Sequence, residues 1–273
     1  MMFHCGTFRF DLSRPLVMGI LNVTPDSFSD GGRYCDQAVD RAYQLIEQGA
    51  DIIDIGGEST RPGAEPVGIR QELDRVLPVI EGLRGIAVPI SIDTFKPEVM
   101  QAAVLAGASM INDINALQHG DALQIAAQHE VAVCLMHKQG DPQTMQARPE
   151  YLEVVAEVLE FLARRIAAAE QAGIARDRIA VDPGFCFGKS LDHNRVLLQR
   201  LHEFSALGVP VLAGLSRKSM LGAMTGRAVD DRMAASVAAA LIAVQRGAAI
   251  VRVHDVAATV DALKIWEHVS KTL

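Results

Sequence analysis

The feature of this sequence that most constrains its fold is a short apolar run that recurs eight times, each time followed by a stretch of helical character. Within each run the apolar residues are continuous and do not alternate with polar ones, which is typical of parallel strands buried on both faces. Eight strand and helix units in 273 residues predict an α/β protein with the fold of a (β/α)8 TIM barrel. The runs cover residues 16–21, 51–56, 88–93, 109–114, 131–137, 178–184, 209–216 and 248–254.

Amphipathic segments between the runs are expected to form helices, among them 37–48, 97–106, 151–172 and 230–245. Each is followed by a glycine that is expected to end the helix in the left-handed conformation: Gly49, Gly107, Gly173 and Gly247. The rival fold is a doubly wound sheet with a Rossmann-type site, but no GxGxxG motif follows the first run. Strand order separates the two folds, since the barrel places the first run beside the last.

Composition and charge limit the classes of function. With 49% hydrophobic and 22% charged residues, the chain suits a single domain spanning residues 1–273. The net charge of −7 is spread without acidic or basic blocks, so we expect neither nucleic acid nor a membrane as a partner. Residues 1–14 are too polar for a signal peptide, and the apolar stretch at 233–244 is too short to span a bilayer. We therefore expect a cytoplasmic protein.

The metal-binding residue types are not clustered in the sequence. Four separated cysteines form no CxxC pair, so neither a zinc site nor a disulfide framework is indicated. No His-x-x-x-His pair is present either, and a tightly held transition metal is not expected. A loosely held Mg²⁺ bridged by substrate is compatible with this sequence.

Two connections, 24–36 after the first run and 58–67 after the second, are too long to be simple turns and are rich in Gly, Pro, Ser and Thr. We predict that both are mobile loops on the active face of the barrel. Arg61 lies in the second loop, where we expect it to reach over the barrel mouth.

Polar residues stand at the ends of the predicted strands, and in a barrel their side chains converge on one mouth. The alternative role for such residues is to cap the following helix. For Asp54 and Asp113 both roles remain open, whereas Pro97 and Pro183 make local turns that leave Asp93 and Asp182 aimed at the mouth. The strand-end residues are Asn22, Asp54, Glu58, Asp93, Asn112, Asp113, His137, Asp182, Ser216, Arg217, Lys218, Arg252 and His254.

These residue types indicate two kinds of ligand group. Carboxylates in a dry pocket suit a ring edge with several N–H donors, such as an aminopyrimidine. Arg252 and His254 lie two residues apart on one strand and share a face, where the next helix N-terminus completes an anion site. Arg217 and Lys218 follow the seventh run, where barrels commonly bind phosphate, although a solvated charge pair is the alternative.

Motifs along nearly the whole chain resemble those of the dihydropteroate synthase family. They are NVTPDSFSDGG at 22–32, DIGGESTRPGA at 54–64, SIDT at 91–94, NDI at 112–114, DPGFCFGK at 182–189, GLSRKS at 214–219 and RVHDV at 252–256. The resemblance implies a folate-pathway transferase in a TIM barrel. It would join 6-hydroxymethyl-7,8-dihydropterin pyrophosphate to p-aminobenzoate, releasing pyrophosphate, and would be a target of sulfonamides.

The same resemblance implies roles for individual residues, and it makes Asp93, Lys218, Arg252 and His254 the catalytic group. The pterin would be held by Asp93, Asn112, Asp182 and Lys218, in a slot shaped by Ile114, Met136, Phe187 and Gly214. The pyrophosphate would be held by Arg252, His254 and Asn22, with Asn22 also the ligand of Mg²⁺. The p-aminobenzoate pocket would comprise Thr60, Arg61, Pro62, Phe28, Phe187, Lys218 and Ser219.

The chemistry of this reaction fits these residue types. An aniline nitrogen is a neutral nucleophile at pH 7, so the difficult step is departure of pyrophosphate. We hypothesise a dissociative displacement in which Asp93 stabilises a pterin cation and closed loops exclude water.

Two positions depart from the family pattern: Cys186, where glycine is commoner, and Lys138, where an apolar residue is common. Alternative functions are a pterin-binding methyltransferase barrel, a catalytically silent pterin-binding homologue and a non-enzymatic scaffold. The first would not need the STRP and SRK motifs, and the second would be expected to have lost loop or anion residues that are present here. The resemblance also implies a homodimer through segments 230–245 and 255–271, although the apolar face of the former could instead pack on its own barrel.

Overall fold

The computed structural model describes residues 1–23, 34–58, 66–140, 145 and 149–270. Its central sheet has eight parallel strands in the spatial order β8-β7-β6-β5-β4-β3-β10-β9. β10 pairs with β3, so the last strand lies beside the first, which confirms the barrel and excludes the doubly wound sheet. The strands are β3 (Leu16–Asn22), β4 (Ile52–Gly56), β5 (Ile90–Asp93), β6 (Met110–Asp113), β7 (Ala132–Met136), β8 (Ile179–Asp182), β9 (Leu212–Ala213) and β10 (Ile250–Val253).

The barrel closes between β8 and β9 through a narrower contact than elsewhere. A single parallel bridge joins Val181 to Val211. The N–H of Val181 donates to the carbonyl of Pro210 at 3.0 Å, but Pro210 has no N–H to extend the ladder. The seventh predicted strand, 209–216, is therefore much shorter in the structure.

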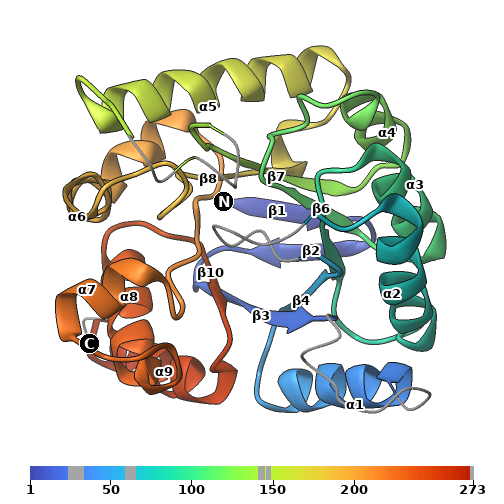
Figure 1. Ribbon diagram of the computed structural model, residues 1–273, viewed down its shortest axis with the longest axis horizontal. Coiled ribbons are helices and arrows are strands. Elements are labelled where there is room, and N and C mark those ends of the chain that lie inside the picture. Colours follow the sequence, from blue (N-terminus) through green and yellow to red (C-terminus); the bar gives the residue numbers. More distant parts are fainter. Residues whose placement is uncertain (24–33, 59–65, 141–144, 146–148, 271–273) are drawn as a thin grey trace.

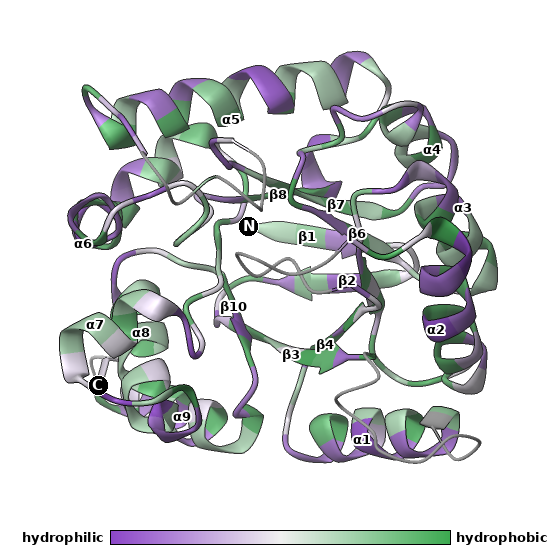
Figure 2. Ribbon diagram, in the orientation of Figure 1, coloured by the Kyte–Doolittle hydropathy of each residue, from purple (hydrophilic) through white to green (hydrophobic). Residues whose placement is uncertain are grey.

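Helices surround the strands and cover the outside of the barrel (Figure 1). Buried aliphatic residues from the outer faces of the strands and the inner faces of the helices form one continuous core. Figure 2 shows the corresponding alternation of hydrophobic and hydrophilic residues along α1 and α5. The helices are α1 (Tyr34–Glu47), α2 (Ile69–Gly82), α3 (Pro97–Ala106), α4 (Ala122–Gln128), α5 (Val154–Gln171), α6 (Leu191–Gln199), α7 (Ser219–Thr225), α8 (Met233–Gln245) and α9 (Val256–Ser270).

The four glycines expected to end helices do so with positive φ: 99° at Gly49, 131° at Gly107, 98° at Gly173 and 97° at Gly247. Some helix starts differ from the prediction. α1 begins at Tyr34, inside the segment assigned to the first long loop, and α8 begins only at Met233 because 229–231 forms a separate 3-10 turn. Within the described residues, no helix has the length and apolar character needed to cross a bilayer.

A hairpin that the sequence analysis did not predict covers one end of the barrel. β1 (Met2–Cys5) pairs antiparallel with β2 (Phe8–Asp11), and both lie inside the ring of strands in the view of Figure 1. The fully buried Phe3 packs with residues at the beginnings of the barrel strands, such as Ile52 and Ile250. The hairpin therefore closes the N-terminal end of the barrel and leaves ligand access to the opposite end.

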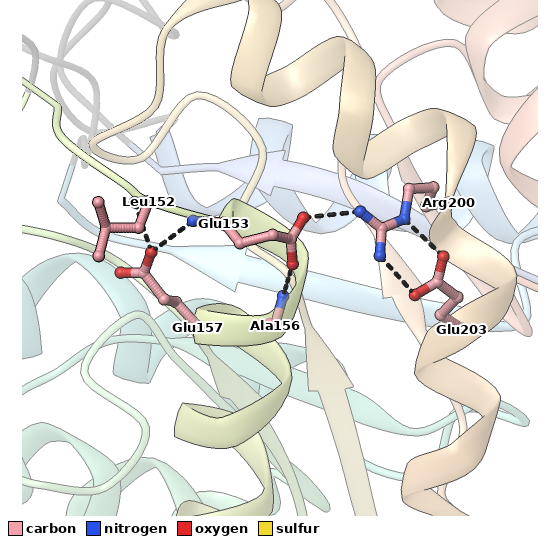
Figure 3. Close-up of polar contacts among 6 residues, drawn as sticks. All are labelled: Leu152, Glu153, Ala156, Glu157, Arg200 and Glu203. Carbon is pink, nitrogen blue, oxygen red and sulfur yellow. Dashed lines mark hydrogen bonds and ion pairs between the residues drawn. The ribbon is translucent and has the colours of Figure 1, made fainter.

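An exposed ion-pair group ties the start of α5 to the segment after α6. The guanidinium of Arg200 lies between the carboxylates of Glu153 and Glu203, at 2.6 Å from an oxygen of each (Figure 3). Glu153 also caps α5 by accepting from the N–H of Ala156. Because these side chains are well exposed, water and salt screen the ion pairs, which add little to stability.

Candidate active site

At the C-terminal end of the barrel, Arg252 bridges two carboxylates that come from different strands. Its Nε donates to Oδ2 of Asp54 at 2.5 Å, and its Nη2 donates to Oδ2 of Asp93 at 2.6 Å. Asp54 is fully buried, and Asp93 is partly buried at the end of β5. The amide of Asn112 also donates to Asp54, at 3.2 Å. Strands β4, β5, β6 and β10 thus contribute side chains to one polar network.

Asp54 and Asp113, whose roles the sequence left open, do different things. Asp54 binds Arg252 and Asn112 and caps no helix, so it belongs to the mouth. Asp113 accepts the backbone N–H groups of Asn115 at 2.7 Å and Leu117 at 2.8 Å. It therefore stabilises the turn after β6 and does not cap the following helix, α4, which begins at Ala122.

The environment of Asp93 disfavours its charged form. Burial and the nearby charge of Asp54 raise the pKa of Asp93, while the Arg252 charge lowers it. The net result is a pKa of about 7. A carboxylate with a pKa near neutrality, paired with a cation in a concave site, is typical of a group that takes part in chemistry.

Asp182 and Lys218 face each other on the other side of the mouth. Oδ1 of Asp182 accepts the N–H of Gly184 at 2.7 Å. At Gly214 a Cβ would lie 3.8 Å from both Oδ2 of Asp182 and Nζ of Lys218, so glycine leaves space between the two charges. Burial raises the pKa of Asp182, while the Lys218 charge lowers it.

Lys218 is fixed by the loop after β8. Its Nζ donates to the carbonyl of Phe185 at 2.6 Å and lies 4.8 Å from the centre of the Phe187 ring. Burial lowers the pKa of Lys218, and Asp182 raises it. The result is an ammonium that faces a carboxylate across a gap, next to an aromatic ring.

His254, which follows β10, and Arg217, which follows β9, have different partners. Oγ of Ser216 lies 2.9 Å from Nδ1 of His254 and accepts its backbone N–H at 3.2 Å. Arg217 forms two hydrogen bonds with Asp255, at 2.7 and 3.3 Å, and has a φ of 58°. Arg217 is thus held by a carboxylate and is not a solvated charge, while Lys218 turns into the mouth.

The remaining predicted residues are distributed as follows. Asn22 ends β3, and Ile114 and Met136 are buried at the ends of their strand segments, all at the mouth end of the barrel. Ser219 is exposed at the start of α7. Phe28, Thr60, Arg61 and Pro62, together with most of the two long loops, lie outside the described residues.

Two lysines near the mouth, one buried and one partly buried, were given no role from the sequence. Lys189 is 2% exposed, and its Nζ lies 2.9 Å from Nδ1 of His137. Lys96 pairs with Glu58 at 2.5 Å and with Glu72. Glu58 in turn accepts the N–H of Val67 at 2.9 Å, which joins the two ends of the second long connection. Buried lysines are rare, and the sequence carried no signal that these two would be enclosed.

The two departures from the family pattern do not disturb these contacts. Cys186 is buried with a φ of 64°, a left-handed conformation that explains why glycine suits this position. Lys138 is half-buried beyond the end of β7.

The mouth therefore combines carboxylates that can accept from ring N–H groups with cations that can hold an anion. Among the described residues, no group of three His, Cys, Asp or Glu side chains could hold a metal ion.

Comparison with known proteins gives a consistent result. Residues 18–254 match the model of a family described as pterin binding enzyme. The chain is 54% identical over 260 residues to the dihydropteroate synthase of Haemophilus influenzae, covering 94% of each. A Xanthomonas albilineans dihydropteroate synthase solved with 4-aminobenzoic acid has a TM-score of 0.94 at 54% identity, covering 100% of this chain and 99% of that one. The Yersinia pestis dihydropteroate synthase, solved as a sulfonamide drug complex, has a TM-score of 0.93 at 48% identity, covering 98% and 99%.

Proposed function

The chain belongs to the pterin binding enzyme family, within the dihydropteroate synthases, and from that premise we propose how its barrel mouth works. The family reaction joins 6-hydroxymethyl-7,8-dihydropterin pyrophosphate to p-aminobenzoate and gives 7,8-dihydropteroate and pyrophosphate. The observation that carries the proposal is the bridge from Arg252 to Asp54 and Asp93, next to the facing pair Asp182 and Lys218. One mouth thus has a ring-binding side and an anion-binding side.

The pterin occupies the side formed by β5, β6 and β8. Asp182 accepts from the amino and N3–H donors of the ring, and Lys218 donates to the ring carbonyl. Asn112 is oriented by its hydrogen bond to Asp54. Gly214 has no side chain between Asp182 and Lys218, which leaves room for a flat ring. The buried Ile114 and Met136, with the ring of Phe187, give the slot its apolar walls.

The pyrophosphate lies beside Arg252 and His254 at the end of β10. Two carboxylates hold the guanidinium of Arg252 and fix its orientation toward the anion. Ser216 holds the imidazole of His254 through Nδ1. These two groups stabilise negative charge on the leaving group.

A Mg²⁺ fits this site only as an ion that takes most of its ligands from the substrate. Asn22 offers one amide oxygen, and the described residues contain no cluster of metal-ligating side chains. Mg²⁺ commonly keeps several waters and binds substrate phosphates with few protein ligands. When bound, it would neutralise part of the charge on the departing pyrophosphate.

Asp93 stabilises positive charge in the ring while the C–O bond to pyrophosphate breaks. Asp93 ends β5 on the pterin side and contacts Arg252 on the anion side. It is therefore close to the reacting carbon whether the C–O bond to pyrophosphate breaks before or after the new C–N bond forms. The ionised carboxylate is the form that does this, and the neighbouring guanidinium favours that form.

The p-aminobenzoate binds where the two long loops meet the mouth. Thr60, Arg61, Pro62 and Phe28 of the loops would join Phe187, Lys218 and Ser219. Support comes from the Xanthomonas albilineans relative, solved with 4-aminobenzoic acid. Sulfonamides are expected to bind the same pocket, since the Yersinia pestis relative was solved in a complex with such a drug.

We also assign a homodimer formed through α8 and α9. Met233 and Ile242 on α8 and Ile265 and Val269 on α9 are exposed at 41–80%, which leaves apolar faces on the outside of the barrel. α8 also buries Ala239, Ala240 and Ala243 against its own barrel, so both of its faces are apolar. Sedimentation equilibrium tests the assignment: Ile265→Glu should shift the protein from dimer to monomer. Cys5, Cys35 and Cys134 are free thiols, and we place the protein in the reducing cytoplasm.

Pyrophosphate release tests the function. We expect release that requires both the pterin pyrophosphate and p-aminobenzoate, together with Mg²⁺. Binding of pterin without release would indicate a silent homologue. A pterin-binding methyltransferase would show no dependence on p-aminobenzoate.

A further inference from the structure

The loop that follows β8 encloses the ammonium group of Lys189. Nζ of Lys189 lies 2.9 Å from the carbonyl of Gly184, 3.1 Å from that of Phe187 and 2.9 Å from Nδ1 of His137. The side chain is 2% exposed, and these strongest contacts are to uncharged acceptors. An ammonium has three donors, so the three acceptors match its hydrogen-bonding capacity.

Taking a lysine out of water is costly, and a buried lysine without an adjacent carboxylate needs a specific compensation. Here the compensation comes from a loop in an unusual conformation. Gly184, Cys186 and Gly188 have φ values of 71°, 64° and 62°. The loop is also pressed against the end of β7, since a Cβ at Gly184 would lie 1.9 Å from the carbonyl oxygen of His137. The ammonium thus ties the carbonyls of Gly184 and Phe187 together, and the former also accepts the backbone N–H of Phe187 at 3.1 Å.

The same loop carries the groups that hold Lys218. The carbonyl of Phe185 accepts from Nζ of Lys218 at 2.6 Å, and the Phe187 ring lies 4.8 Å from that atom. The carbonyls of Gly184 and Phe187 bind Lys189, while the carbonyl of Phe185 and the ring of Phe187 contact Lys218, so both lysines are held by the same short loop. A shift of the loop around Lys189 therefore moves both contacts of Lys218.

We propose that Lys189 is a positioning residue for pterin binding, which acts by folding the loop from Asp182 to Gly188 into the shape that holds Lys218. It does not touch the pterin. This inference rests on the proposed function, because it takes the groove between Asp182 and Lys218 as the pterin site.

The charges around the mouth agree with this role. The carboxylate of Asp182 attracts the ammonium of Lys189, and removal of Lys189 takes away this favourable interaction at the pterin side. Burial lowers the pKa of Lys189 and the Asp182 charge raises it, and the net pKa is about 7. Burial also lowers the pKa of His137 to about 3, so the imidazole is neutral and its Nδ1 can accept from Lys189.

The test compares Lys189→Met, which removes the charge and all donors, with Lys189→Gln, which keeps two neutral N–H donors. The probe is 6-hydroxymethylpterin, and its dissociation constant is measured by fluorescence. We expect binding to weaken by about tenfold in Lys189→Met and by less in Lys189→Gln, because buried carbonyls lose their donors. Lys189→Gln is the smaller change and supplies the measurement if the Met variant does not fold.

Two controls separate positioning from a general loss of stability. Pyrophosphate, which binds across the mouth at Arg252 and His254, should keep its dissociation constant in both variants. Leu83→Ala, a fully buried position at the end of α2 and far from the loop, supplies a comparable loss in Tm and should bind pterin normally. Unchanged pterin binding in the folded Lys189 variants, or equal weakening of pterin and pyrophosphate, overturns the inference. Failure of the wild-type protein to bind 6-hydroxymethylpterin contradicts the proposed function instead.

Discussion

Arg252 on β10 reaches across the mouth to Asp93 on β5 and donates a hydrogen bond of 2.6 Å to its carboxylate. The two strands are not neighbours, because β3 and β4 lie between them in the sheet. Asp54 on β4 supports the span by accepting from Nε of the same guanidinium. The site for a leaving anion and the carboxylate that faces the ring are therefore directly coupled.

Asp93→Asn should lower kcat by about 100-fold or more, because it removes the negative charge that stabilises the developing pterin cation. The asparagine keeps the shape of the side chain and one acceptor for Arg252. The dissociation constant of 6-hydroxymethylpterin should therefore change much less than kcat. Steady-state kinetics and fluorescence titration measure the two quantities, and full turnover in this variant would show that the charge of Asp93 has no catalytic role.

The pH dependence of the reaction should report the same carboxylate. Burial raises the pKa of Asp93 from 3.8 to about 7, and the active form is the ionised one. Consequently kcat/KM for the pterin substrate should fall as the pH is lowered below about 7. The fall of kcat/KM at low pH should be absent from the profile of Asp93→Asn. If this variant shows the same fall, a group other than Asp93 is responsible for it.

Asp113→Ala should reduce stability and leave pterin binding unchanged. Its carboxylate serves the backbone N–H groups of Asn115 and Leu117, and their loss should lower the free energy of unfolding by about 1–3 kcal/mol. Burial raises the pKa of Asp113 from 3.8 to about 6, so the folded protein binds the proton more tightly than the unfolded chain. The part of its contribution that depends on pH is thus full below the unfolded pKa and is lost as the pH rises through about 6, while the two hydrogen bonds remain. Urea unfolding of both proteins across this range should show the difference between them shrinking, and a constant difference would contradict this titration.

Ser216→Ala should weaken the anion site alone. Without the hydroxyl at 2.9 Å, the imidazole of His254 loses a partner that fixes its orientation. We expect the KM for the pterin pyrophosphate to rise several-fold, while binding of 6-hydroxymethylpterin, which has no phosphate, stays the same. Equal effects on both ligands would place Ser216 in the pterin site.

The sequence was sufficient for the barrel and for the positions of most polar residues, because strand ends in a parallel barrel necessarily meet at one mouth. The sequence could not decide which of Asp54 and Asp113 has its side chain in the mouth. That choice depends on Arg252, which is 198 residues from Asp54 along the chain. Enclosure of Lys189 was likewise unpredictable, since it results from the path of a single loop and lysines are ordinarily exposed.

The N-terminal hairpin, by contrast, did leave a signal in the sequence. Phe3, Cys5, Phe8 and Phe10 alternate with polar residues on both sides of Gly6, which is the pattern of two short strands and a turn. The segment is too short to be identified as a barrel strand, and its burial becomes evident only when the open end of the barrel is in place.

Gly184→Ala and Gly226→Ala form a matched pair that separates backbone strain from steric conflict at the pterin site. Both glycines are left-handed, with φ values of 71° and 70°, so either alanine costs about 1–2 kcal/mol through its conformation. At Gly226, beyond the end of α7, a Cβ meets no atom within 4 Å, and we expect only this cost.

At Gly184 the Cβ would lie 1.9 Å from the carbonyl oxygen of His137, and backbone cannot move aside as a flexible side chain does. The loop must shift, which withdraws the Gly184 carbonyl from Lys189 and disturbs the Phe185 carbonyl that holds Lys218. We therefore expect Gly184→Ala to lose more stability than Gly226→Ala in urea unfolding, and to bind 6-hydroxymethylpterin more weakly, while Gly226→Ala binds it normally. If the two variants lost the same stability and bound pterin equally well, the close packing of this loop on β7 would have no part in shaping the site.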